Sequence, residues 1–272
     1  MLASQRRSRI LDEVRRSGAV RVSSLVEHLG VSDMTVRRDL EMLAQEGTLR
    51  KVHGGAVLPG ARSTDEPGFA AKSHQQTPEK EAIAAEALRL VEPGMALGIS
   101  GGTTTWTFAR LLRDVPDITV VTNSTQVADM FSREPRPDQT VVLTGGTRTP
   151  SDSLVGPFAV SAIRSVNLDV VFMGVHGMDP DSGFTTPSLM EAETDRAFVD
   201  ATRRFVVLAD HTKYSVRGIS TIAGIDAADV LITDSGLAEE HRNGLAERVG
   251  DLVVVRPGEH ARGADAPGEP TA

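Results

Sequence analysis

Residues 100–105 have the composition of an anion-binding turn. They follow an apolar run at residues 96–99 and read Ser100, Gly101, Gly102, Thr103, Thr104 and Thr105. Glycines let the backbone approach an anion, N–H groups at a helix start point toward it, and hydroxyls add donors. The turn lacks the Gly-Lys-Ser/Thr of a Walker loop and the glycine spacing of a dinucleotide fingerprint. It predicts a phosphate cradle, with an ordinary strand-to-helix turn as the alternative.

Further polar residues follow other apolar runs of the same region. They are Asn123, Ser124, Gly145, Gly146 and Lys213. A lysine ammonium is a point charge suited to phosphate or carboxylate, and amides and hydroxyls suit the hydroxyls of a sugar. Each of these residues alone is usually a turn, cap or solvated residue. Together with residues 100–105 they predict a binding site for a small polyhydroxylated anion.

These residues meet if the apolar runs are strands of one parallel sheet. Seven such runs alternate with helical segments, at residues 96–99, 118–122, 140–144, 170–173, 205–209, 230–233 and 252–255. Nearly continuous apolar strands with intervening helices indicate a sheet covered on both faces, and ligands bind beyond the carboxyl ends of its strands. The fold class is therefore α/β, with a larger Rossmann-like parallel-sheet domain over residues 77–256. Its first helix should be capped by Thr77 and end at Gly94.

A second group of residues, 31–45, has the pattern of a helix that contacts DNA. Ser32 is an N-cap residue, and Val36, Leu40 and Leu43 recur at helical spacing, which predicts one buried face. The opposite face and its flanks then carry the candidate contact residues Met34, Thr35, Arg37 and Arg38, and Ser32 at the helix start is a further candidate. Arginine binds guanine or phosphate, while Thr and Met contact the methyl group of thymine.

The neighbouring segments complete a winged helix-turn-helix. We expect one helix at residues 6–16 and a second that is capped by Ser23 or Ser24 and ends at Gly30. Two strand-like runs, at residues 48–52 and 56–58, predict a hairpin wing that brings cations to DNA: Arg50, Lys51 and His53. The prediction is a small N-terminal domain over residues 1–58 that binds double-stranded DNA. The alternative is a three-helix domain whose arginine pair only solvates one face.

The charge distribution favours nucleic-acid contact by the N-terminal segment alone. The net charge is −8 at pH 7, yet residues 1–58 carry ten Lys/Arg against seven Asp/Glu. That segment is therefore at +3 and the remainder at −11. Sequence-independent affinity for DNA comes from local cations. A basic N-terminal segment followed by an acidic remainder is therefore compatible with DNA binding.

Length and composition set the remaining expectations. A chain of 272 residues favours two domains, and residues 59–76 have the composition of a linker. Residues 257–272 are expected to form a disordered tail. No apolar run approaches the roughly 18 residues that span a bilayer, and the start lacks a signal-peptide block, so we expect a cytoplasmic protein. The absence of cysteine and the unpaired histidine spacing predict no metal and no cofactor.

Two runs of the N-terminal segment, at residues 35–40 and 49–56, resemble the DNA-binding head of DeoR-type bacterial transcriptional regulators. They read TVRRDL and LRKVHGGA. Residues 102–105, 122–124, 143–146, 153–157, 169–177 and 208–213 look like the effector domain of that family. The resemblance implies a winged helix and an effector-binding domain similar in fold to ribose-5-phosphate isomerase and glucosamine-phosphate deaminase. It also implies phosphorylated sugars or related metabolites as effectors. At Ser100 the sequence departs from the family, which often has an acidic residue there.

An isomerase-like or deaminase-like enzyme with an accessory DNA-binding domain is the alternative function. Isomerisation needs a positioned carboxylate base and a partner acid, and the related isomerase has acids just after the strand that here ends at residues 172–177. Here no carboxylate follows until Asp179, while Glu191 and Glu193 are typical of helix-start electrostatics. The sequence therefore predicts a non-enzymatic repressor of a carbohydrate-metabolism operon that a phosphorylated sugar releases from its operator. Operator half-sites imply a homodimer or homotetramer.

Overall fold

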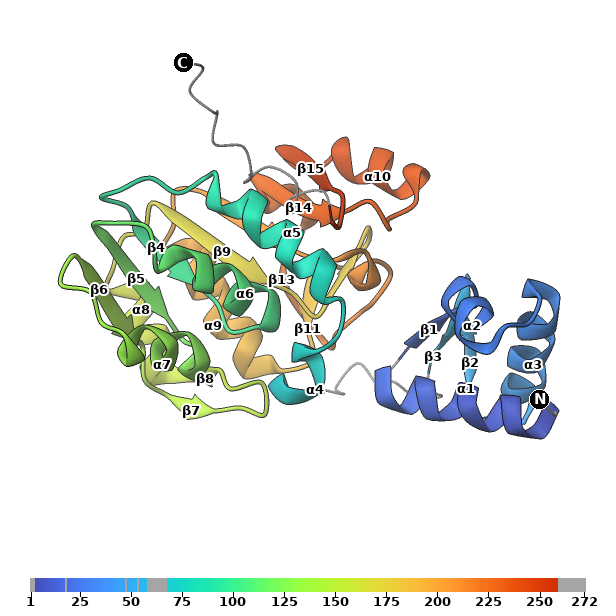
Figure 1. Ribbon diagram of the computed structural model, residues 1–272. Coiled ribbons are helices and arrows are strands. Elements are labelled where there is room, and N and C mark those ends of the chain that lie inside the picture. The colour runs from blue at the N-terminus through green and yellow to red at the C-terminus, as the bar shows by residue number, and fades with distance from the viewer. Residues whose placement is uncertain (1–2, 18, 47, 53, 58–67, 259–272) are drawn as a thin grey trace, which may run out of the picture. The chain divides into compact units, whose positions relative to one another are not determined.

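The computed structural model describes residues 3–17, 19–46, 48–52, 54–57 and 68–258. The chain forms two compact units, Met1–Asp65 and Glu66–Ala272, whose elements are labelled in Figure 1. Among the described residues, no helix is both long enough and apolar enough to cross a membrane.

In the described part of the N-terminal unit, helices pack against a small antiparallel sheet. The helices are α1 Ala3–Ser17, α2 Val22–Leu29 and α3 Asp33–Gln45, and the strands are β1 Ala19–Arg21, β2 Arg50–Val52 and β3 Gly55–Val57. The strands pair in the order β1-β3-β2. The predicted apolar faces meet in one core that includes Ile10, Val14, Leu25, Val36, Leu40 and Leu43. The unit is thus a helix-turn-helix with a wing, as predicted.

One helix start in this unit was predicted wrongly. α2 begins at Val22, so Ser23 and Ser24 lie inside the helix, and its N-cap residue Arg21 makes no side-chain capping bond. The reason is that the preceding residues form β1, and the Val22 N–H donates to the carbonyl oxygen of Gly54 at 2.8 Å. The predicted end of α2 is confirmed, because Gly30 adopts a left-handed conformation with φ 64°.

The C-terminal unit is built on a seven-stranded parallel sheet. Its strands are β4 Ala96–Ile99, β5 Ile118–Thr122, β6 Gln139–Leu143, β9 Val170–Gly174, β12 Phe205–Leu208, β14 Val230–Asp234 and β15 Asp251–Val255. They lie in the order β15-β14-β12-β9-β4-β5-β6. Each of the predicted apolar runs forms a strand of this sheet, which confirms the predicted α/β fold.

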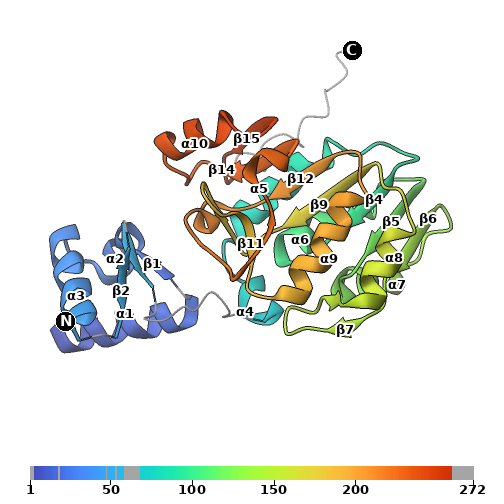
Figure 2. The same ribbon diagram turned by 180° about the vertical axis from the view of Figure 1, so that it is seen from behind.

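Helices cover both faces of the sheet. α5 Thr77–Leu88, α6 Thr103–Leu112 and α7 Thr125–Arg133 pack on one face, and α8 Pro157–Arg164, α9 Leu189–Asp200 and α10 Glu239–Ala246 pack on the other. α5 and α6 lie in front of the sheet in Figure 1, whereas α8 and α9 lie in front in the reverse view of Figure 2. Neighbouring residues of β9 divide between the two cores: Phe172 packs with α6 and Val171 with α9. The same apolar strands therefore contribute side chains to both cores.

Smaller elements surround the sheet and were not predicted. β7 Thr147–Arg148 pairs with β8 Leu154–Val155, and a second antiparallel sheet contains β10 Gly177–Asp179, β11 Gly183–Thr186 and β13 Ser220–Ala223. Short 3-10 helices occur at His211–Lys213 and Ile225–Ala227.

The segment before the sheet differs from the prediction. Within the predicted linker at residues 59–76, helix α4 Phe69–Ser73 forms, because the Phe69 ring packs edge-on against Trp106 with centroids 5.9 Å apart. α5 has Gln76 rather than Thr77 as its N-cap residue and ends at Leu88 rather than at Gly94. Its last turn tightens, since the next three N–H groups donate to carbonyls three residues back. Residues 59–67 of the predicted linker and 259–272 of the predicted tail lie outside the described residues.

Candidate functional site

A pocket lies at the carboxyl ends of β4, β5, β9 and β12. Six predicted ligand-binding residues line it: Gly101, Gly102, Thr103, Thr104, Asn123 and Lys213. Residues that were not predicted complete the lining: Phe69, Lys72, Ser151, Ser153, Gly174, Val175, His176, Thr186, Glu191, Asp195 and Ile222. The fold thus brings together strand-end residues that are far apart in the sequence.

The glycine- and threonine-rich turn supplies hydrogen-bond donors to one wall of the pocket. Gly102 is the N-cap residue of α6, so Thr103 and Thr104 lie in the first helical turn. N–H groups in that turn have no acceptor within the helix, and the helix dipole favours an anion there. The Gly101 N–H donates to Asn123 Oδ1 at 2.8 Å, and a Cβ atom at Gly101 would overlap Ser153. The backbone here is therefore held close against its neighbours.

Five predicted residues do not line the pocket: Ser100, Thr105, Ser124, Gly145 and Gly146. The Ser100 hydroxyl accepts the N–H of Gly174 at 3.2 Å and so joins β4 to β9. Thr105 is buried and donates to the carbonyl oxygen of Gly102 at 3.0 Å. Ser124 is the N-cap residue of α7. The three hydroxyls thus satisfy backbone groups next to the pocket.

Gly145 and Gly146 form the turn between β6 and β7. Their φ values are 73° and 124°, a conformation that side chains disfavour. A Cβ atom at Gly146 would also overlap the carbonyl oxygen of Val155. The two glycines therefore shape the β7–β8 hairpin, whose loop brings Ser151 and Ser153 to the pocket.

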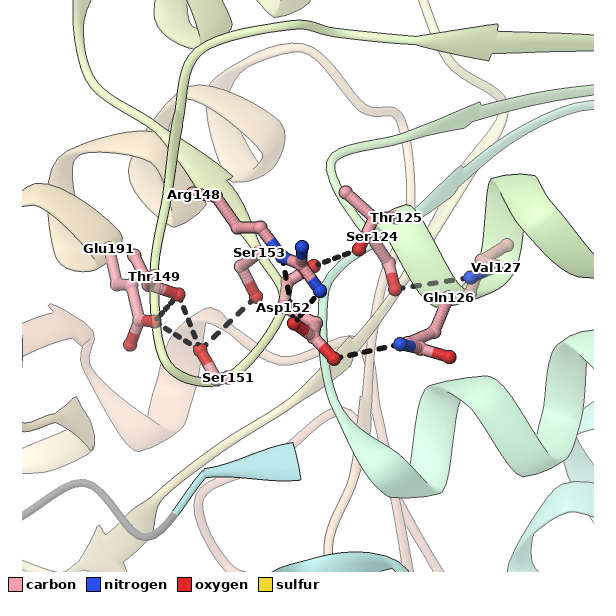
Figure 3. Close-up of polar contacts among 10 residues, drawn as sticks. All are labelled: Ser124, Thr125, Gln126, Val127, Arg148, Thr149, Ser151, Asp152, Ser153 and Glu191. Atoms are coloured by element: carbon pink, nitrogen blue, oxygen red, sulfur yellow. Dashed lines mark hydrogen bonds and ion pairs between the residues drawn. The ribbon is translucent and has the colours of Figure 1, made fainter. Parts of the chain in front are cut away.

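Glu191 anchors that loop from α9. Its Oε1 accepts hydrogen bonds from Thr149 Oγ1 at 3.0 Å and Ser151 Oγ at 2.6 Å, and its Oε2 accepts one from Thr186 Oγ1 at 2.9 Å. Figure 3 shows Glu191 beside Thr149 and Ser151. Hydroxyl donors from two separate chain segments fix the carboxylate, so its geometry is set by the protein itself.

Asp152 fixes the other side of the same loop. Its Oδ1 accepts from Arg148 Nε at 2.9 Å and its Oδ2 from Gln126 Nε2 at 2.8 Å. The Thr125 Oγ1 hydroxyl donates to the Asp152 carbonyl oxygen at 3.1 Å, and these contacts are drawn in Figure 3. The hairpin loop is therefore a pre-ordered wall of the pocket, tied to both α7 and α9.

Asp195 lies one turn beyond Glu191 on α9 and also lines the pocket. Burial raises the pKa of Asp195 well above its ordinary value, and Glu191 raises it further against the opposing effect of Arg196. The side chain keeps partial exposure because it borders the pocket. The ionised form of this carboxyl is therefore disfavoured by its surroundings.

Lysines gather elsewhere in the pocket. Lys72 and Lys213 line it, and Lys80 is buried beside them. Lys80 Nζ donates to the carbonyl oxygens of Lys72 at 2.7 Å and Gln75 at 2.6 Å. Burial lowers the pKa of Lys80 to about 8, an effect that Asp210 opposes and that Lys213 and Lys72 increase. Lys72 and Lys213 thus both act on the ammonium group of Lys80, and the three positive charges together favour a multiply charged anion.

Asp179, the first carboxylate after β9, does not line the pocket. It forms an ion pair with Arg217 at 2.8 Å. Burial would raise the pKa of Asp179, but Arg217 and the N–H groups of Ser182 and Asp181 outweigh burial and lower it. Within the described residues, no cluster of three or more His, Asp or Glu side chains is arranged to hold a metal ion.

In the N-terminal unit, α3 presents the predicted DNA-contact residues on its first turns. The Ser32 side chain caps the helix by accepting the Thr35 N–H at 3.3 Å, and Met34 is 79% exposed. Arg37 pairs with Asp33 at 2.5 Å. Arg38 is exposed and has no hydrogen bond or ion pair with another described residue. Arg38 is therefore the arginine of this pair that is available to a partner.

The wing and α1 are both tied to α3. Lys51 on β2 is exposed, and its Nζ lies 3.3 Å from Glu41 Oε1 of α3. Arg50 also lies on β2, whereas His53 is outside the described residues. Asp39, which was not predicted to have a role, is buried and pairs with Arg6 of α1 at 2.5 Å between Nε and Oδ2. This pair helps to set how α3 is presented.

A winged helix-turn-helix unit followed by an α/β unit with a polar pocket defines a two-domain DNA-binding regulator. The DeoR-like helix-turn-helix domain family matches residues 6–61, and the DeoR C terminal sensor domain family matches residues 75–235. The chain belongs to the DeoR family of transcriptional regulators.

Curated relatives match nearly the whole chain. The HTH-type transcriptional regulator GlpR of Haloferax volcanii is 36% identical over 93% of this chain and 98% of its own length. The putative aga operon transcriptional repressor of Escherichia coli O157:H7 is 30% identical over 93% and 94%. The glycerol-3-phosphate regulon repressor of Escherichia coli K12 is 31% identical over 86% and 92%.

Among solved structures, a ribose 5-phosphate isomerase A from Methanocaldococcus jannaschii matches with 17% identity and a TM-score of 0.36. The match covers 50% of this chain and 53% of the isomerase.

Proposed function

We propose that this protein is a repressor that binds its operator through α3 and the β2–β3 wing and is released when a phosphorylated sugar binds in the pocket. The observation that carries the proposal is the composition of the pocket. Lys72 and Lys213, with Lys80 buried beside them, share it with the first turn of α6. Lysine ammonium groups and helix-start N–H groups both favour a phosphate. The hydroxyls of Ser151, Ser153 and Thr104 suit the hydroxyls of a sugar.

The names of the relatives support this proposal. Two of them are called repressors, of an aga operon and of a glycerol-3-phosphate regulon. In the N-terminal unit of this chain, the exposed Arg38 and Met34 lie on the first turns of α3, the part of a recognition helix that reads base edges. We therefore assign residues 1–58 to operator binding.

We infer that occupancy of the pocket acts on the N-terminal unit through the chain itself. Phe69 and Lys72 of α4 line the pocket, and Phe69 is four positions beyond Asp65, the last residue of the N-terminal unit. We therefore assign α4 and residues 77–256 to effector binding. An effector that contacts α4 binds the first described helix of the C-terminal unit. A coupling of about 1–3 kcal/mol would change operator affinity 5–150-fold.

The proposal includes a symmetric oligomer and no catalysis. Operator half-sites are read by symmetric proteins, so a homodimer or homotetramer is the expected form. A general base needs a carboxylate that is directed at the substrate. Glu191 accepts its hydrogen bonds from three hydroxyls of the protein, which supports a positioning role.

The test is a mobility shift on DNA that flanks the protein's own gene, titrated with a panel of sugar phosphates. We expect a specific complex that one or a few of these compounds dissociate at concentrations where the corresponding free sugars do not. A complex that no phosphorylated compound affects would contradict the assignment of the pocket. Turnover of a pentose or amino-sugar phosphate by protein free of contaminating enzymes would instead favour an enzyme.

A further inference from the structure

The charged groups of the pocket come from two sets of elements. Lys72 lies on α4 and Lys213 in the 3-10 helix after β12, and both act on Lys80 of α5. Glu191 and Asp195 project from consecutive turns of α9. The lysines and the acids therefore reach the pocket from different elements.

These two acids differ in their partners. Glu191 accepts hydrogen bonds from Thr149, Ser151 and Thr186, so both of its oxygens are engaged. Asp195 has no hydrogen bond with any other residue that the structure describes, and it borders the pocket. Arg196, the cation nearest to it in the chain, donates instead to the carbonyl oxygen of Thr221 and is exposed. Asp195 is therefore the pocket carboxyl that is open to a ligand.

A partly buried carboxylate without a cation is costly, because it has lost part of its hydration and gained no opposite charge. Here the cost is increased by Glu191, which adds a second negative charge one helical turn away. Burial and Glu191 both raise the pKa of Asp195, which is the sign of an uncompensated site. In the empty pocket these surroundings favour the protonated, neutral form of Asp195. A ligand ammonium group would supply the missing opposite charge and so favour the carboxylate, whereas a ligand hydroxyl would supply no charge.

We propose that the effector carries a cationic amino group in addition to its phosphate, and that Asp195 binds this amino group while the lysine cluster binds the phosphate. The inference rests on the proposed function, since it assigns a second group of the same ligand. It narrows the effector from phosphorylated sugars in general to amino-sugar phosphates or phosphorylated amines of similar size. Glu191 acts here as a positioning residue that also strengthens the field at Asp195.

The test compares matched pairs of ligands that differ at one group. The full-length protein is titrated calorimetrically with glucosamine 6-phosphate and glucose 6-phosphate, and with galactosamine 6-phosphate and galactose 6-phosphate. We expect the amino member of at least one pair to bind about tenfold or more tightly, as is typical of a charge-assisted hydrogen bond. Asp195→Asn keeps the shape and removes the charge, so the two members should then bind about equally. Glu193→Gln, at an exposed acid of α9 outside the pocket, is the control and should keep the preference.

The outcomes separate this inference from the proposed function. Equal binding of both members by the unchanged protein would overturn the amino-group inference and leave a sugar-phosphate sensor intact. A preference that survives Asp195→Asn would also overturn it, because the amino group would then be bound elsewhere. If no member of either pair binds, while other sugar phosphates release the operator, the inference fails alone. If no sugar phosphate binds at all, the proposed function fails with it.

Discussion

The backbone N–H of Phe69 donates to the carbonyl oxygen of Pro150 at 3.2 Å. Phe69 begins α4, the first described helix after the N-terminal unit, and Pro150 lies in the β7–β8 loop. Glu191 anchors that loop through the residues on either side of Pro150, Thr149 and Ser151. The first described helix of the C-terminal unit is therefore bonded to a wall of the pocket. If the proposed coupling exists, this contact makes α4 the element to test first.

Phe69→Ala should weaken the effector response and leave operator binding unchanged. The ring packs edge-on against Trp106 at 86°, and such a pair contributes about 0.5–1.5 kcal/mol. Its loss should raise the sugar-phosphate concentration needed for half-release by about 2- to 10-fold, measured by mobility shift. Phe158→Ala, at an aromatic side chain that is 80% exposed on α8, is the control and should respond normally. A normal response of the Phe69 variant would mean that α4 does not carry the coupling.

Lys213→Ala and Thr104→Ala should leave operator binding intact and impair release by the effector. Both side chains line the pocket, and neither lies in the DNA-binding unit. Loss of the ammonium should cost more than loss of the hydroxyl, because hydrogen bonds to charged groups contribute about 1.5–3 kcal/mol against about 0.5–1.5 for neutral ones. Titration calorimetry with the releasing sugar phosphate measures both. Thr107→Ala, on the same helix but outside the pocket, serves as the control, and normal release by both pocket variants would show that the pocket is misassigned.

Arg38→Ala should weaken operator binding by about 1–3 kcal/mol if the guanidinium reads a base. The structure singles out this arginine, because it is exposed and unpaired among the described residues whereas Arg37 is paired with Asp33. If Arg38 binds phosphate instead, affinity should fall equally for all sequences and the salt dependence should decrease. Mobility shifts at several salt concentrations distinguish the two cases. Arg164→Ala, an exposed arginine of α8, is the control, and unchanged affinity of the Arg38 variant would remove it from the interface.

The main sheet could be predicted from sequence because burial on both faces leaves a continuous apolar signal. Val171 and Phe172 face opposite cores, yet both are fully buried, so the run of β9 contains no polar interruption. β7 was missed because Thr147 and Arg148 are both exposed and give no such signal. Strands of this kind are defined by their partners, such as Val155 opposite Thr147, and a local pattern does not reveal the pairing.

The pocket residues that directly follow strands could be predicted from the sequence, whereas those that lie elsewhere could not. Gly101, Thr104 and Lys213 line it because parallel strands end at one edge. Glu191 reaches the pocket from a helix and is fixed by hydroxyls of distant segments, so its spacing in the sequence indicates only a helix start. Phe69 lies in a stretch of linker composition, and its order depends on the packing against Trp106. The pocket residues that local sequence patterns do not reveal are therefore placed by tertiary contacts.

The lowered pKa of Lys80 predicts that the C-terminal unit becomes more stable as the pH rises above about 8. Burial lowers its pKa from 10.5 to about 8, so the unfolded chain binds more protons than the folded chain between those values. The free energy of unfolding must then rise as the pH increases from about 8 to 10.5, since the cost of the buried charge disappears. One pKa unit corresponds to about 1.4 kcal/mol, so the rise from this residue should be about 3 kcal/mol.

The measurement is urea unfolding at a series of pH values, followed by the fluorescence of Trp106. This is the one tryptophan of the sequence and it lies in the C-terminal unit, so its signal reports on the unit that contains Lys80. Lys80→Met keeps the length of the side chain and removes the titrating group, so the rise above pH 8 should be smaller than in the unchanged protein. Lys51→Met, at an exposed lysine of the N-terminal unit, should leave the rise unchanged and controls for removal of a charge. Parallel curves for the unchanged protein and the Lys80 variant would show that Lys80 titrates near its ordinary pKa and that its ammonium is better compensated than the contacts with Lys72 and Gln75 imply.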